Sequence, residues 1–181
     1  MNRVLFAKFV LASAILSGCG YHVAGRSDAL PKTVHVIAVP AIENKTSSYR
    51  IEQRLTAATI HEFLVHTNYK AVSSPESGDA VLRGKVLTLE AVPLIFVSTP
   101  ATATTPAITR ATTMLVTMKC DVTLTEAATQ KVLYHSDNFV FRNEYEISSD
   151  VKSFFEEQDP ALDRMAQDFA KRLVAAVTEN F

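Results

Sequence analysis

The clearest pattern in the sequence is an alternation of apolar and polar residues between Arg110 and Leu124. Alternate positions share one face, and all but the first of them are apolar: Thr112, Met114, Val116, Met118, Cys120, Val122 and Leu124. Most positions between them hold Thr, Lys or Asp. A period of two is typical of an antiparallel strand with one buried and one solvated face. A second segment, Lys131–Arg142, follows after the connection Glu126–Gln130, so the two segments predict a β-hairpin.

Three further segments have the character of strands. Thr33–Val39 is rich in β-branched residues and lies between two prolines, which is typical of a short buried strand. Tyr69–Val72 predicts a brief strand, and Ala80–Val97 predicts a long one. Within the long strand, Gly84 is a candidate bulge and Pro93 a candidate interruption.

The segment from Ser98 to Thr109 differs from its neighbours. It is rich in Thr, Ala and Pro, and it contains neither a charged residue nor a hydrophobic period. We therefore expect an extended loop at the tip of a long hairpin. Loops of this length without structure of their own are usually functional or disordered. Two interpretations stay open, a flexible hairpin tip and a segment that contacts a partner protein.

A first amphipathic helix is predicted from about Tyr49 to His66. It follows the turn-forming cluster Asn44–Ser48, whose side chains are candidates for capping the helix N-terminus. Glu52 lies near the positive end of the helix dipole, where a negative charge is favourable.

A second helix is predicted at the C-terminus, where apolar residues recur with a helical period. Its apolar stripe comprises Leu162, Met165, Ala166, Phe169, Leu173, Ala176 and Val177. Two starts are open, Asp159 as cap with Pro160 in the first turn, or a capping box of Ser153 and Glu156. Two helices and these strands predict an α+β fold, a two-layer sandwich of two helices on a mixed, mainly antiparallel four- to five-stranded sheet.

The N-terminus has the three parts of a secretory signal peptide. Arg3 and Lys8 form a basic region, Phe9–Leu16 is uncharged and apolar, and Leu16–Cys19 reads Leu-Ser-Gly-Cys, which is similar to a bacterial lipobox. We expect cleavage between Gly18 and Cys19, with Cys19 carrying a diacylglyceryl group and an N-acyl chain such as palmitate. Residues 1–18 would then be the signal peptide, and residues 19–181 a single lipid-anchored domain facing the periplasm. Gly20 after the cysteine favours sorting to the outer membrane.

Charge and residue counts exclude several classes of protein. Lys and Arg number 18 and Asp and Glu 19, a formal net charge of −1, which argues against a nucleic-acid binder. Two cysteines rule out a disulfide framework, and the alternation around Cys120 places that residue in the core. The five histidines are scattered, and no Gly-rich or nucleophile motif occurs. We therefore expect neither an enzyme, nor a metal site, nor a cofactor.

Several short motifs resemble the lipopolysaccharide-assembly lipoprotein family (LptE family) of Gram-negative outer membranes. They run in order along the chain: Cys19–Gly25, Leu30-Pro31, Val39-Pro40, Asn44–Thr46, Ile51–Thr56 and Asp79–Val86. The most specific piece is Cys-Gly-Tyr-His at the start of the mature chain. The uncharged loop at 98–109 is a departure from the better-known members.

The resemblance implies an outer-membrane lipoprotein that sits as a plug inside a large LptD-like β-barrel. Together the two proteins would transport lipopolysaccharide and insert it into the outer leaflet. Direct binding of lipopolysaccharide is left open, because no lipopolysaccharide-contacting residue could be matched by motif. The alternative is a periplasmic lipoprotein that acts as a scaffold or activator of a cell-wall or secretion complex.

Overall fold

The computed structural model describes residues 30–104, 106–146 and 151–179, with the side chains of the last helix described from Leu162 onward. The strands are β1 (Val36–Ala38), β2 (Glu43–Asn44), β3 (Lys70–Val72), β4 (Ala80–Thr99), β5 (Ile108–Glu126) and β6 (Val132–Glu146). The helices are α2 (Ile51–His66) and α3 (Val151–Glu179), with a short 3₁₀ turn at Pro75–Ser77.

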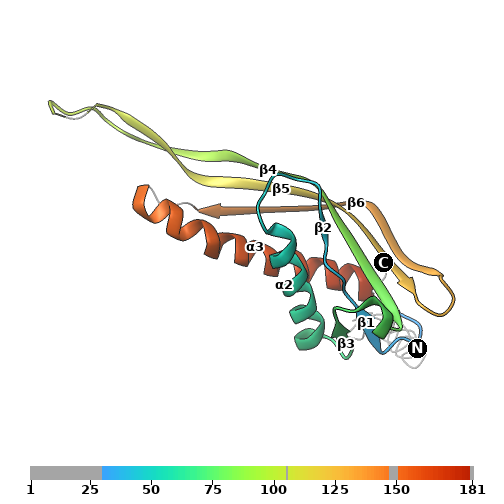
Figure 1. Cartoon of the computed structure of the whole chain (residues 1–181). Helices are drawn as coiled ribbons and strands as arrows, with labels where there is room; N and C mark the ends of the chain where they lie inside the picture. The colour runs from blue at the N-terminus through green and yellow to red at the C-terminus, as the bar shows by residue number, and fades with distance from the viewer. Residues whose placement is uncertain (1–29, 105, 147–150, 180–181) are drawn as a thin grey trace, which may run out of the picture.

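The strands form one mixed sheet in the order β3-β1-β4-β5-β6, and β2 pairs with β4 beside β1. β1 pairs in parallel with both β3 and β4, and β2 pairs in parallel with β4. The pairs β4–β5 and β5–β6 are antiparallel. Figure 1 shows α2 and α3 on one side of this sheet. The predicted two-layer α+β sandwich is confirmed, with six strands in place of four or five.

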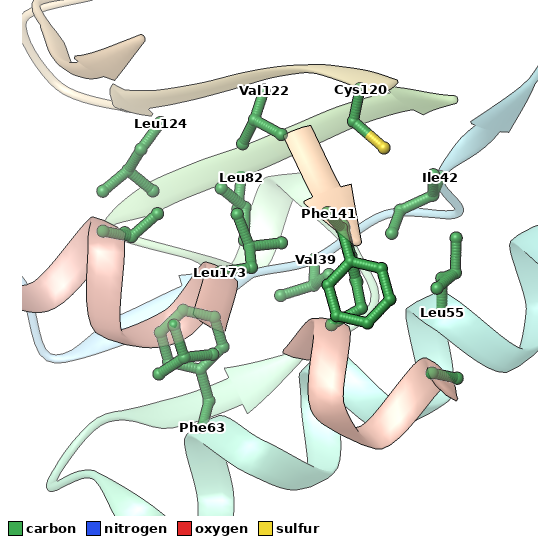
Figure 2. Close-up of a cluster of buried hydrophobic side chains, with 14 of the residues drawn as sticks. Val39, Ile42, Leu55, Phe63, Leu82, Cys120, Val122, Leu124, Phe141 and Leu173 are labelled. Atoms are coloured by element: carbon green, nitrogen blue, oxygen red, sulfur yellow. The ribbon is translucent and has the colours of Figure 1, made fainter. Parts of the chain in front are cut away.

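The alternation that predicted β5 corresponds to the observed burial. Val116, Met118, Cys120, Val122 and Leu124 are all buried on the face that meets the helices. Figure 2 shows Cys120, Val122 and Leu124 of β5 in one apolar cluster with Leu55 and Phe63 of α2 and Leu173 of α3. Each fully buried side chain of this size contributes roughly 1.5–3 kcal/mol.

The second layer is held mainly by α3. Phe169 lies between two phenylalanines of β6, with its ring centroid 5.7 Å from that of Phe139 and 5.9 Å from that of Phe141, both edge to face. Edge-to-face aromatic pairs are favourable beyond the area that they bury. The predicted apolar stripe is largely confirmed, since its members Met165, Ala166, Phe169, Leu173 and Val177 are buried.

Both predicted starts of the C-terminal helix are wrong. The helix begins at Val151, so Pro160 lies in its interior and Ser153 lies within its first turn. Helix propagation is cooperative, and most helical stability in proteins comes from packing of an amphipathic face. The packed stripe from Met165 onward therefore stabilises a helix that begins earlier in the chain than either predicted cap.

The start of α2 also differs from the prediction. The residue at its N-cap is Arg50, in the left-handed region with φ 58°, and no side chain caps the helix. The predicted cap residues bond to each other instead, and the side-chain Oδ1 of Asn44 accepts a hydrogen bond from the Thr46 N–H at 2.8 Å. The Asn44 amide donates to Ser48 O at 2.8 Å and to Glu52 Oε2 at 3.0 Å, so this turn is fastened to the helix from the side.

Two residues expected to disturb β4 act differently from each other. Gly84 is not a bulge, since the nearest register shift falls between Val86 and Thr88. Gly84 lies against Ile42, whose Cγ1 would be only 3.2 Å from an added Cβ, so the glycine allows close packing. Pro93 does not end the strand, but a register shift between Pro93 and Ile95 follows it.

Candidate functional site

The outstanding surface feature is the distal part of the β4–β5 hairpin, residues 91–112, which we call the arm. β6 ends at Glu146, opposite Thr113 of β5, which pairs with Ile95 of β4. Only β4 and β5 remain paired from Phe96 to Ala111, whereas Ala91–Pro93 still lie in the three-stranded part. Figure 1 shows this two-stranded ribbon projecting past the end of β6 and past α3. The strands reach Thr99 and Ile108, so the connection is shorter than the loop predicted at 98–109, although its place at a hairpin tip is confirmed.

The arm exposes large apolar side chains on both of its strands. Six of them are between 40% and 57% exposed: Val92, Leu94, Ile95, Phe96, Val97 and Ile108. No charged residue occurs from Ala91 to Thr109. Contiguous exposed apolar surface of this kind usually marks an interaction site.

The arm is held in shape by its own backbone pairing and a few polar contacts. Phe96 pairs with Ala111, and Thr99 pairs with Ile108. The Ser98 and Thr109 hydroxyls lie 2.9 Å apart across the hairpin. A hollow of about 390 Å³ is lined by Val97, Thr99, Ile108, Arg110 and Thr112. The hollow is apolar apart from its threonines and one cation, Arg110.

Sequence reasoning missed the part of this surface that lies on β4. The continuously apolar run Leu94–Val97 is part of the long strand predicted at Ala80–Val97, and its exposure was not predicted. A run without a period of two makes both faces of a strand apolar, and the same pattern is typical of a fully buried strand, so it does not indicate exposure. The neighbouring absence of charge at 98–109 did point to the correct end of the molecule.

The remaining candidate residues fall into structural roles. Burial raises the pKa of the Cys120 thiol to about 12, so Cys120 is a core residue, as predicted. His66 Nδ1 lies 3.1 Å from Oε1 of the largely buried Glu62 one turn earlier on α2, and His135 lies on β6. In the part of the chain that the structure describes, no three His, Cys, Asp or Glu side chains are grouped to hold a metal ion.

The predicted lipid-attachment site is not part of the described structure. Gly18 and Cys19, at the expected cleavage position, lie outside the described residues, as does the whole signal peptide. Among the helices that are described, none is long and apolar enough to span a bilayer.

Comparison with protein families decides the assignment. The model of the family described as "LptE: Lipopolysaccharide-assembly" matches residues 34–177. The chain belongs to the LptE family. The match includes both helices and the whole sheet, and it places this chain among the proteins of lipopolysaccharide assembly. A search of curated proteins gives no match.

Several solved structures align with this chain at low sequence identity. The hypothetical protein CT253 from Chlamydia trachomatis aligns with a TM-score of 0.52 at 10% identity, over 80% of this chain and 96% of that one. The rare lipoprotein B from Shewanella oneidensis aligns with a TM-score of 0.47 at 12% identity, over 80% of this chain and 94% of that one. A lipoprotein from Caulobacter crescentus aligns with a TM-score of 0.47 at 12% identity, over 77% of this chain and 88% of that one. At these identities the likeness concerns the fold alone.

Proposed function

We propose that this LptE-family member is a non-enzymatic outer-membrane lipoprotein that works with a large LptD-like β-barrel in lipopolysaccharide transport. In this account the folded domain plugs the barrel and helps to assemble it. The observation that carries the proposal is the arm, because it presents uncharged apolar surface that no other described part of the chain covers.

The arm is suited to contact with another protein. Two-stranded ribbons are only marginally stable in water on their own, and three or more strands or a packed face are normally needed. Here the ribbon continues beyond the third strand with its apolar side chains exposed. A partner that covers these side chains would remove them from water and thereby stabilise both the ribbon and the complex.

The anchor belongs to the same proposal. Cys19 would carry the diacylglyceryl and N-acyl chains, and residues 1–18 would be removed as the signal peptide. Two or more acyl chains give stable membrane anchoring, whereas one chain gives only reversible binding. The domain would then be tethered to the outer membrane with its sheet in reach of the barrel.

The barrel partnership is tested by shortening the arm. Residues 99–106 are replaced by an Asn-Gly turn, and the protein is co-expressed with the barrel of the same bacterium and purified under identical conditions. We expect unchanged folding and lost co-purification of the barrel. Full retention of the barrel by the shortened protein would refute a role of the hairpin tip, whereas the exposed apolar side chains at 92–97, which this variant keeps, are tested by Phe96→Asp.

The anchor is tested by Cys19→Ala. We expect the protein to be released from membranes or left unprocessed, because no thiol remains for acylation. Intact mass and membrane fractionation report the result. A Cys19→Ala protein that stays processed, membrane-bound and unchanged in mass except for the substitution itself would contradict the anchor.

A further inference from the structure

Two open edges of the sheet, that of β6 and that of the distal part of β4, are built differently. β6 pairs with β5 alone among the described strands, so its outer edge is open from Val132 to Glu146. It carries ionisable residues along its length, namely His135, Asp137, Arg142, Glu144 and Glu146, and a register shift opposite Asp121. Charges and bulges are the usual devices that keep an edge strand from pairing with another chain.

The open edge of β4 has few charges, although its pairing with β5 shifts register after Val86, after Pro93 and after Ile95. β1 and β2 pair with β4 only at its start, where the last contact is the Lys45 N–H donating to Val86 O at 3.0 Å. Beyond Val86, no described strand pairs with this edge, and Glu90 is the one charged residue before the end of the strand.

The segment Leu94–Thr99 is the uncharged end of this edge, and its pairing with β5 is regular from Phe96 to Thr99. It reads Leu-Ile-Phe-Val-Ser-Thr, and it lies between Pro93 and Pro100. Six residues of high β propensity, without charge, Pro or Gly, are typical of segments that pair readily with another strand. In an antiparallel pair alternate residues direct their N–H and C=O groups away from the partner strand, so this edge presents unsatisfied backbone groups.

Lipid is a poor occupant for such an edge. Hydrocarbon offers no hydrogen bonds, and every unsatisfied backbone group in it costs several kcal/mol. Acyl chains could cover the side chains of Phe96 and its neighbours but would leave the outward backbone groups of β4 unpaired.

A second copy of this chain is also a poor occupant. Six residues extend about 20 Å, so two copies joined edge to edge would bury a strip of roughly 200 Å² each. A stable interface buries about 800 Å² per partner. The contact needs a partner that pairs with the edge and covers the faces of the arm at the same time.

We infer that the Leu94–Thr99 edge of β4 pairs through its main chain with an extended, uncharged segment of the barrel partner. This inference rests on the proposed function, because it takes the barrel as the occupant. Closure of a barrel pairs each wall strand on both sides, so the segment must come from outside the paired wall. Main-chain pairing supplies the affinity, and the apolar side chains of the arm determine which segment fits.

Hydrogen exchange at single-residue resolution tests the inference on the unmodified protein. The full chain is measured alone and in its co-purified complex with the barrel of the same bacterium. We expect the amides of Leu94–Thr99 that point away from β5 to exchange at least about tenfold more slowly in the complex, since their opening would require loss of the new strand. The amides at the open edge of β6 are the matched control and should be less affected.

The outcomes separate this inference from the proposed function. A complex that forms while the outward amides exchange as in the free protein would overturn edge pairing and leave the partnership with the barrel intact. Failure to form any complex would overturn both. Protection of these amides by lipopolysaccharide micelles alone, or in the isolated protein as its concentration rises, would also overturn the inference in favour of lipid or of a second copy.

Discussion

The same two strands, β4 and β5, lie in opposite environments at their two ends. Near the start of β4, Leu82 pairs with Leu124 and is 2% exposed beneath the helices. Near its end, Phe96 pairs with Ala111 and is 57% exposed. Both residues are large and apolar, so their burial is decided by the layers above them rather than by their chemistry. The proximal hairpin is part of the core, and the arm is surface that requires a partner.

The largest effect should come from truncating the aromatic centre of the body. Phe169→Ala is expected to lower the free energy of unfolding by roughly 3–5 kcal/mol, the usual range for a buried Phe. The matched variant Phe96→Ala in the arm should change it by less than about 0.5 kcal/mol, because Phe96 is exposed. Urea unfolding of the purified domain measures both values. Equal losses in the two variants would contradict the division into body and arm.

A smaller effect is expected where the backbone of the body is tightest. A Cβ added at Gly78 would lie 2.7 Å from both Ala38 N and Ala38 Cβ, so the backbone itself must move. Gly78→Ala should therefore destabilise the protein by about 1–3 kcal/mol, the range for overpacking.

Gly84→Ala is the control for Gly78→Ala, since its added Cβ would meet only the flexible side chain of Ile42. Thermal unfolding of both variants gives the comparison. If Gly78→Ala is as stable as Gly84→Ala, the close packing of the turn at Gly78 against Ala38 of β1 is refuted.

The smallest effect concerns the carboxylate that fastens the proximal end of β4. Asp79 Oδ2 accepts hydrogen bonds from the His35 N–H at 2.8 Å and the Val36 N–H at 2.9 Å. These two bonds hold the pKa of Asp79 below its ordinary value. The side chain is exposed, so its contribution to stability is about 1 kcal/mol at most.

The sign of the pH dependence follows from the lowered pKa. The ionised carboxylate is favoured in the folded state, so its stabilisation is present above the unfolded pKa of about 3.9 and is lost as pH falls through the folded value. The stability difference between wild type and Asp79→Ala should be constant above about pH 5 and shrink below about pH 4. Urea unfolding between these values tests it, with the exposed Glu76→Ala as control. A difference that stays constant with pH would exclude the carboxylate as the cause.

The elements that could be predicted from the sequence are those whose buried residues recur with a regular period. The alternation in β5 and the stripe around Phe169 both repeat with the geometry of their own element, because each faces the other across the core. The helix starts were wrong for a complementary reason. Local cap signals at Asp159 and Ser153 are weaker than tertiary packing, which carries the helix back to Val151.

The candidate site was predicted only in part. The lack of charge at 98–109 located the hairpin tip, since it is visible in composition. The exposure of Leu94–Val97 was not predictable in the same way, because it depends on where β6 ends at Glu146. That end is set by strand pairing between distant parts of the chain, which the local apolar pattern of β4 does not encode.

The central claim, that the arm is the surface that binds the barrel, is tested most directly by one charge placed on it. Phe96→Asp is compared with Val132→Asp, a strand residue of similar exposure, 52% against 57%, on β6. Both variants are co-expressed with the barrel, and the ratio of barrel to lipoprotein is measured after purification. The account predicts near-wild-type unfolding for both, with barrel recovery reduced at least about tenfold for Phe96→Asp, since a buried unpaired charge costs several kcal/mol. Equal barrel recovery in the two variants would contradict it.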